Sequence, residues 1–121
     1  VVVRAKYSEG RRQNKLGRLY QACRDENGEL REVGRLSTGF TDEELETVTE
    51  KLEPLVTEQD GREVAFRPEV VLEVAFEEVQ RSPEYDSGFA LRFPRFEGFR
   101  EDLAVEDADT LERVESMYES Q

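Results

Sequence analysis

Three arginines in the segment Ser82–Asp102 are the side chains best suited to chemistry in this sequence. Arg92, Arg95 and Arg100 lie among phenylalanine and glycine residues. Guanidinium groups bind phosphate oxygens in a bidentate manner, and aromatic rings stack on nucleobases. These residues therefore fit a surface that binds phosphates or nucleic acid. They fit equally a strand that leaves a hydrophobic core and carries solvated arginines.

Other catalytic chemistries find little support in the sequence. There is no histidine, and Cys23 is the only cysteine, so histidine-based triads, His/Cys metal clusters and an intrachain disulfide are excluded. We therefore expect no metal-binding residues in this chain. Adjacent carboxylates, such as Glu43 with Glu44 and Glu77 with Glu78, are typical of solvated faces rather than of a glycosidase site.

The composition is that of a folded but very acidic chain. Its 121 residues suffice for one domain with a modest core. The net charge is −12 and 38% of the residues are charged, yet clear strand and helix periodicity argues against disorder. Abundant Asp and Glu with few lysines resemble the proteins of salt-loving archaea. An acidic tail for basic partners is the rival explanation, although the acids are not confined to one run.

Charge is unevenly distributed along the chain. Residues 1–35 hold nine basic and five acidic groups, whereas residues 36–80 hold three basic and thirteen acidic groups. A domain that touches nucleic acid gathers its basic groups in one place, here the N-terminal third and the segment Arg92–Arg100.

No apolar run approaches the length of about 18 residues that a membrane span needs. We expect a cytoplasmic or nucleoid-associated protein.

Alternating apolar and polar residues predict about five strands. The first begins at Val1 itself, which indicates a piece of a longer protein. Gly34 marks a bulge, Asn27-Gly28 marks a hairpin turn, and at Pro94 the last strand should end or reach a sheet edge. The predicted extended segments are Val1–Tyr7, Leu16–Arg24, Leu30–Leu36, the short piece Glu63–Arg67, Val70–Phe76 and Phe89–Phe93.

Two helices complete the predicted pattern. Thr41 should cap the first helix with Glu44 as its capping-box partner, and Pro54 should end it. Asp107 or Asp109 should cap a C-terminal helix. The inward-facing residues are Leu45, Val48 and Leu52 in the first helix and Ala108, Leu111, Val114 and Tyr118 in the second. We therefore predict a mainly β chain with two helices: a five-stranded OB-fold barrel, a helix after the third strand and a C-terminal helix.

The segment Gln80–Asp102 resembles the last conserved motif of ATP-dependent DNA ligases of the archaeal and eukaryotic replicative kind. It reads Ser-Pro-x-Tyr-x-Ser-Gly-Phe-Ala-Leu-Arg-Phe-Pro-Arg-Phe and follows the family almost without a gap. The resemblance implies that residues 1–121 are one OB-fold domain, the C-terminal fragment of a longer ligase whose catalytic domain is absent. Fainter similarity covers Gly10–Arg12, Gly17, Thr38–Thr41 and Pro68–Val74.

The resemblance also implies a division of work with that catalytic domain. The family's nucleophile is the lysine of a Lys-x-Asp-Gly motif, which this chain lacks, so the fragment holds no catalytic residue. The domain would close over ATP to orient its pyrophosphate, and would then clamp nicked double-stranded DNA for sealing. ATP and Mg²⁺ would be bound mainly by the ligase's own nucleotidyltransferase domain. A sliding clamp is a further implied partner.

Contacts to the ATP phosphates are implied for three residues. Arg100 and Asp102 match the family's Arg-x-Asp-Lys signature, so Arg100 would touch the phosphates and Asp102 would orient it, with Arg95 as a further contact. The alternative for Arg100 and Asp102 is a surface ion pair worth about 0–1 kcal/mol. The sequence departs from the family at Gly98, where arginine is usual, and at Leu103, where lysine is usual. Leu103 removes the usual lysine and with it one phosphate contact, and it could also pack the final helix.

Contacts to DNA are implied for a second group. Arg92 and Phe93 match a family pair that lies at the minor groove beside the nick, where an aromatic wedge can distort the duplex. Alternation puts Phe93 on the same face as Phe89 and Leu91, so a core position and a DNA contact both stay open for it.

Three further basic residues belong to the predicted loop Ser8–Lys15. Arg11 and Arg12 would contact the DNA backbone without reading sequence. Lys15 is a candidate for the same role, and it also fits a plain surface position.

Other functions remain open at this stage. A free-standing module that binds single-stranded nucleic acid would be a binder rather than part of an enzyme. The equivalent domain of an RNA ligase or capping enzyme shares the logic of the motif, although the Leu-Arg-Phe-Pro-Arg run argues against it. An acidic protein-interaction domain would bind no nucleic acid. Preference for duplex over single strand separates the ligase domain from these alternatives.

Overall fold

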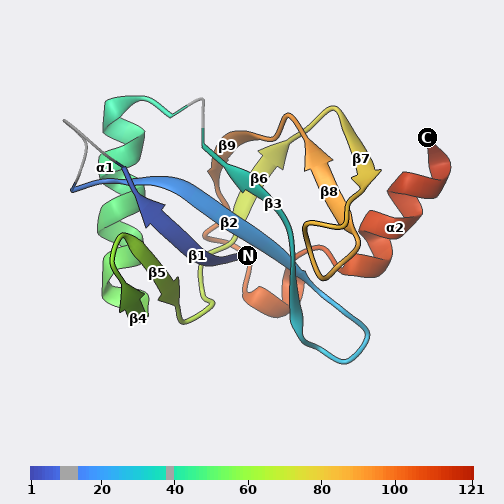
Figure 1. The fold of residues 1–121 in the computed structure, drawn as a ribbon, viewed down its shortest axis with the longest axis horizontal. Helices are drawn as coiled ribbons and strands as arrows, with labels where there is room; N and C mark the ends of the chain where they lie inside the picture. The colour runs from blue at the N-terminus through green and yellow to red at the C-terminus, as the bar shows by residue number, and fades with distance from the viewer. Residues whose placement is uncertain (9–13, 38–39) are drawn as a thin grey trace.

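The computed structural model describes residues 1–8, 14–37 and 40–121. This part of the chain folds into short antiparallel strands with two helices (Figure 1). Its elements are β1 Val2–Tyr7, β2 Leu16–Arg24, β3 Leu30–Leu36, α1 Asp42–Leu52, β4 Val56–Asp60, β5 Glu63–Phe66, β6 Leu72–Ala75, β7 Glu78–Arg81, β8 Phe89–Arg92, β9 Arg95–Phe99 and α2 Leu111–Ser120, with 3-10 turns at Glu53–Leu55 and Val105–Asp107. Within these ranges, neither helix is long or apolar enough to cross a membrane.

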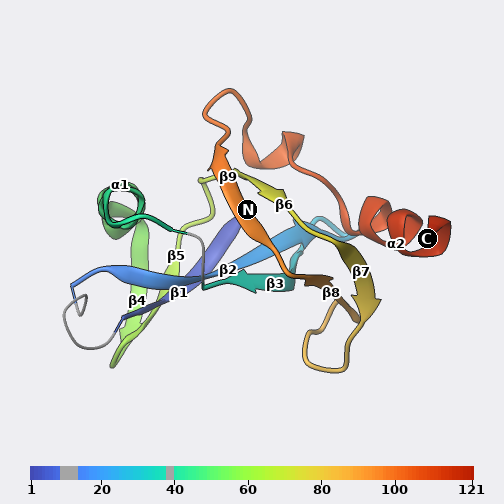
Figure 2. The ribbon, with the colours of Figure 1, turned by 90° about the horizontal axis from the view of Figure 1, so that it is seen from above.

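Five strands form the main sheet, in the order β3-β2-β1-β5-β4, and all their pairings are antiparallel. Two small sheets, β6–β9 and β7–β8, lie next to the main sheet. The strand β3 lies beside β8 (Figure 2). Just before β6, the carbonyl of Val70 accepts from the amide of Val2 at 3.0 Å. This is the predicted OB-fold class, mainly β with a helix after the third strand and a C-terminal helix.

The bounds of β2 and β3 agree with the prediction, and β1, β5, β6 and β8 are shorter than predicted. The strands β4, β7 and β9 were not predicted. Four of the five residues of β4 are exposed, and in β7 only Val79 is buried, so neither strand shows the alternation that marks a half-buried strand. The strand β8 ends at Arg92, just before Pro94, as expected, but a further strand, β9, begins at Arg95. Proline cannot donate to a ladder, but here the chain only changes direction and pairs again from Arg95.

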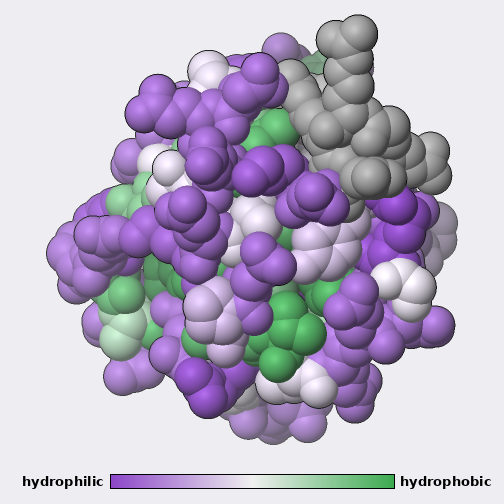
Figure 3. Space-filling view, turned by 90° about the vertical axis from the view of Figure 1, so that its left-hand side faces the viewer, coloured by the Kyte–Doolittle hydropathy of each residue, from purple (hydrophilic) through white to green (hydrophobic). Residues whose placement is uncertain are grey.

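The first helix lies on the main core, as its apolar spacing predicts. Val48 and Leu52 are fully buried in a cluster with residues of β1, β2, β3 and β5. The predicted capping box is confirmed: the Thr41 side chain accepts from the Glu44 amide at 3.1 Å, and the Glu44 carboxylate accepts from the Thr41 amide at 2.9 Å. On this side the surface is mainly hydrophilic, with hydrophobic residues visible only in patches (Figure 3).

The second helix covers a smaller core of Val79, Phe89 and Val114, against which Leu111 and Tyr118 pack. The predicted caps of this helix are wrong. The cap is Thr110, whose hydroxyl accepts from the Arg113 amide at 3.2 Å. Asp107 instead accepts from the amide of Ala104 in the preceding 3-10 turn, and Asp109 pairs with Arg113 at 3.3 Å. A threonine cap was available in the sequence, but aspartate is the more common cap, which favoured the wrong residues.

Candidate functional site

The turn between β8 and β9 exposes an aromatic ring in a strained backbone conformation. Phe93 has φ of 51°, and it is the exposed large hydrophobic residue of the described chain, with 58% of its surface accessible. A left-handed conformation is costly for a bulky residue. It arises because β8 pairs with β7 as far as Arg92, whereas β9 pairs with β6 from Arg95, so the chain must turn between two sheets. The core position considered for Phe93 is therefore wrong.

Arg92 lies across that exposed ring. Its guanidinium carbon is 5.0 Å from the centre of the Phe93 ring, within the range of a cation–π contact. Its Nη1 donates to Glu78 Oε1 at 2.8 Å, and Glu78 is the cross-strand partner of Arg92 in the β7–β8 ladder. Both side chains are about half exposed. We call Arg92, Phe93 and Glu78 the β8–β9 corner.

Arg95 starts β9 just beyond this corner. Its side chain is exposed, and across the described residues no carboxylate pairs with it. Arg92, Phe93 and Arg95 therefore lie within four consecutive positions of the chain, with Pro94 between Phe93 and Arg95.

Arg100 and Asp102 form the predicted pair. Arg100 Nε donates to Asp102 Oδ1 at 3.0 Å and its Nη2 donates to Oδ2 at 2.9 Å, which is a bidentate contact. Glu73 Oε1 is 3.8 Å from the same guanidinium. The hydrogen bond from Arg100 lowers the pKa of the Asp102 carboxyl, and the bond to Asp102 raises the pKa of Arg100. Both groups are open to solvent, so the guanidinium can still be reached by a phosphate.

Leu103 lies between the motif and the second helix. It is half-buried and lines a cavity of about 360 Å³ that Val114 and Met117 of α2 also line. Leu103 and α2 thus border the same cavity, and direct packing of Leu103 against the final helix stays a prediction.

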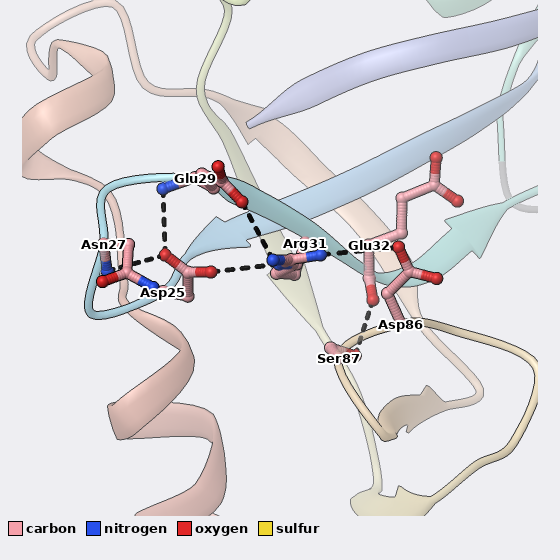
Figure 4. Close-up of polar contacts among 7 residues, drawn as sticks. All are labelled: Asp25, Asn27, Glu29, Arg31, Glu32, Asp86 and Ser87. Carbon is pink, nitrogen blue, oxygen red and sulfur yellow. Dashed lines mark hydrogen bonds and ion pairs between the residues drawn. The ribbon is translucent and has the colours of Figure 1, made fainter.

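The first half of the motif is held against β3. The Ser87 hydroxyl donates to the carbonyl of Glu32 at 2.7 Å, and Arg31 lies 3.6 Å from the Asp86 carboxylate (Figure 4). Gly88 has φ of 82°, a backbone conformation that would be strained in a residue with a side chain. The carbonyl of Gly88 accepts from the Ser82 amide at 2.9 Å. These residues position β8 and hence the corner, so their part in the motif is structural.

The basic loop is only partly described. Arg11 and Arg12 lie outside the described residues. Lys15 is half-buried at the start of β2, where its carbonyl accepts from the Ser8 amide at 2.9 Å. It lines an open polar pocket with Tyr7 and Arg62. The start of β2 lies at the left of Figure 1, away from the junction of β8 and β9, so these two segments of the chain are separate.

The sequence did not indicate Glu78 or Glu73 as residues of the site. In the structure Glu78 pairs with Arg92, and Glu73 lies 3.8 Å from Arg100. The register that puts Glu78 opposite Arg92 could have been found only by recognising β7, whose sequence Glu-Val-Gln-Arg has one buried residue. For a nucleotide, the exposed guanidinium groups of Arg95 and Arg100 fit phosphate oxygens. For a metal ion, the described residues offer no group of three or more ligating side chains.

Comparison with known proteins agrees with the resemblance found in the sequence. A family model described as the ATP dependent DNA ligase C terminal region matches residues 12–103. The chain is 55% identical over 114 residues to a DNA ligase of the halophilic archaeon Halorubrum lacusprofundi. The aligned residues make up 94% of this chain and 19% of that protein. The chain is 50% identical to a DNA ligase of Archaeoglobus fulgidus, over 100% of this chain and 22% of that protein.

Among solved structures, the ligase domain from M. tuberculosis LigD is similar, with a TM-score of 0.73 at 25% identity, over 90% of this chain and 36% of that chain. The chain spans about a fifth of the length of the curated relatives reported above.

Proposed function

Because this chain belongs to the C-terminal region of the ATP-dependent DNA ligases, we propose that it is the OB-fold domain of a longer ligase. Residues 1–121 would act as one domain that assists lysine adenylylation and then clamps nicked duplex DNA. The chain lacks a Lys-x-Asp-Gly sequence, so the lysine nucleophile would come from the nucleotidyltransferase domain of the same ligase.

The observation that best supports a DNA-binding role is the β8–β9 corner. An exposed ring in a left-handed conformation costs roughly 1–2 kcal/mol of backbone strain and gains no core packing in return. Strain of this kind often has a functional reason. Here Phe93 would wedge against base steps in the minor groove beside the nick, and Arg92 would meet the negative potential of the same groove.

A second group would act at the nucleotide. Arg95 and Arg100 would contact the leaving phosphates of ATP, and Asp102 would hold Arg100 in position through its bidentate contact. ATP supplies the adenylyl group, and fixed guanidinium groups stabilise charge that develops on the leaving phosphates. Mg²⁺ would be held mainly by the nucleotidyltransferase domain. Leu103 offers no cation here, so the phosphate contact that lysine would make is absent from our proposal.

The two roles need two placements of one domain. Arg11, Arg12 and Lys15 would contact the DNA backbone once the domain has swung onto the duplex, since backbone contacts orient a protein without reading sequence. Hinge motion between domains is a common way for one domain to take up two placements in turn. A sliding clamp would be a partner of the whole ligase.

Binding preference tests the proposal. The isolated domain should bind a labelled nicked duplex more tightly than a single strand of the same length, and Arg92→Ala should weaken duplex binding. Arg113→Ala is the matched control, because it removes an exposed arginine of α2 that pairs with Asp109 away from the motif. With labelled ATP and Mg²⁺, the isolated domain should form no covalent AMP adduct.

Stronger binding to the single strand would instead support a single-strand module. The absence of binding to any nucleic acid at any salt concentration would support an acidic interaction domain. A stable AMP adduct would refute a purely accessory role.

A further inference from the structure

Two arginines of the motif already have a carboxylate partner within the domain. Arg92 pairs with Glu78 at 2.8 Å, and Arg100 pairs with Asp102 at 2.9 Å. The chain is strongly acidic, with 29 Asp and Glu residues against 17 Lys and Arg, so such partners are available throughout. The Glu78 pair is the one that lies in the β8–β9 corner.

Backbone pairing fixes Glu78 in this place. Glu78 and Arg92 are direct partners in the antiparallel β7–β8 ladder, and the amide of Glu77 donates to the carbonyl of Arg92 at 2.9 Å. The carboxylate therefore cannot move away from Arg92 by more than a change of side-chain rotamer. The Arg92 side chain exposes 47% of its surface, and the Glu78 side chain exposes 43%. DNA can therefore reach the guanidinium without unfolding the strand.

An exposed ion pair of this kind is weak enough to be exchanged for a contact with DNA. When an arginine neutralises a phosphate, the duplex releases condensed cations, and this release makes binding weaken as salt rises. If the arginine must first leave a carboxylate, that carboxylate is left unpaired beside the DNA and attracts a cation in turn. The cation that the protein takes up then offsets part of the cations that the DNA releases.

We propose that Glu78 is an internal counter-ion of Arg92, which DNA displaces, and that this exchange makes binding of the nicked duplex less sensitive to salt. The inference rests on the proposed function, because it requires Arg92 to contact DNA. It assigns to Glu78 a role in tuning that contact: the carboxylate keeps Arg92 over the Phe93 ring in the free domain and limits the net release of ions on binding.

The test measures the affinity of the full-length ligase for a fluorescent nicked duplex whose 3′ end is a dideoxynucleotide, so that no sealing occurs. The logarithm of the association constant is plotted against the logarithm of KCl concentration for the natural protein and for Glu78→Gln. Glutamine keeps the size of the side chain and removes its charge. Glu29→Gln is the matched control, because Glu29 also pairs with an arginine, Arg31 at 2.9 Å, in the β2–β3 hairpin.

We expect Glu78→Gln to bind up to about fivefold more tightly at low salt. Its slope should be steeper by up to about 0.9, the contribution of one phosphate contact. The two binding lines should therefore converge as KCl rises. Glu29→Gln should leave the slope unchanged, and the double variant Arg92→Ala/Glu78→Gln should have the slope of Arg92→Ala, because Glu78 acts only through Arg92.

Two failures can be told apart. If Arg92→Ala leaves affinity for the nicked duplex unchanged, the proposed DNA contact is wrong and the inference about Glu78 falls with it. If Arg92→Ala weakens binding while Glu78→Gln has the same slope as Glu29→Gln, the DNA contact stands and the role of Glu78 is refuted.

Discussion

Phe93 combines a φ of 51° with an exposed ring, and each feature alone lowers the stability of a folded domain. The natural side chain would therefore be retained for a contact that the free domain does not make. A residue that tolerates the left-handed conformation should relieve the strain while removing the ring, so stability and DNA binding should change in opposite directions.

We predict that Phe93→Gly leaves the domain as stable as the natural chain or more stable by up to about 1 kcal/mol, because relief of about 1–2 kcal/mol of strain outweighs the greater backbone entropy of glycine in the unfolded state. Affinity for the nicked duplex should fall. Phe93→Asn, which also tolerates this conformation, should behave in the same way. Thermal unfolding and DNA binding measured on the same samples would check this. A clear loss of stability in both variants would show that the ring packs within the domain.

At the scale of residues, the sequence predicted one contact within the candidate site and left the burial of Phe93 open. The resemblance to the ligase motif implied that Asp102 holds Arg100, and the structure contains this pair. Whether Phe93 is buried could not be predicted, because alternation holds only while the chain stays in one ladder. Here the chain passes from the ladder with β7 to the ladder with β6.

The β2–β3 hairpin shows how a loop in this acidic chain is stabilised. Asp25 accepts from Arg31 Nε at 3.0 Å and from the backbone amides of Asn27 and Glu29 at 2.8 and 2.9 Å (Figure 4). The bond from Arg31, followed by those from the two amides, lowers the pKa of the Asp25 carboxyl. Gly28, with φ of 80°, allows the turn.

This hairpin should make part of the stability depend on pH. A carboxyl whose pKa is lower in the folded chain stabilises that chain fully above its unfolded pKa of about 3.9. This stabilisation is lost as pH falls through the folded pKa. We therefore predict that the difference in thermal midpoint between the natural chain and Asp25→Asn is positive near neutral pH and narrows in acid. Arg31→Gln should give the same narrowing, since it removes the other partner of the bond. A difference that stays constant from neutral pH into acid would contradict this explanation.

At the scale of elements, prediction succeeded where residues are half-buried and regular. The bounds of β2 and β3 agree with the structure, and α1 begins at its predicted capping box. The predicted bulge near Gly34 is confirmed, since the ladder with β2 shifts register between Gly34 and Glu32. The prediction failed for β4, which is polar and pairs across the turn at Gly61 with β5. Edge strands of this kind form because a neighbour needs a hydrogen-bonding partner, and this requirement leaves little trace in their own sequence.

Charge is the feature that governs the whole molecule. Residues 36–80 hold thirteen acids against three bases, and many of these acids are exposed on α1 and on the β4–β5 hairpin. Like charges so close together repel one another across water. The Debye length falls from about 30 Å at 0.01 M salt to about 3 Å at 1 M, so salt should screen most of this repulsion.

We predict that the thermal midpoint of the chain rises steeply with KCl into the molar range, because screening removes self-repulsion from the compact state more than from the unfolded chain. Affinity for DNA should fall over the same range, since phosphate contacts weaken with salt. Scanning calorimetry at increasing KCl would check the first trend. A midpoint that does not change with salt would refute adaptation of this surface to high salt.

The central claim is that one domain serves two steps of ligation through different arginines, and single-turnover kinetics of the full-length ligase test it most directly. Arg100→Ala should slow self-adenylylation by roughly 10–150-fold, the loss of one charge-assisted contact, and should hardly affect sealing of DNA that is already adenylylated. Arg92→Ala should do the reverse: normal adenylylation, weaker binding of the nicked duplex and slower sealing. Equal slowing of both steps by both variants would contradict the account and leave the motif as a structural strand.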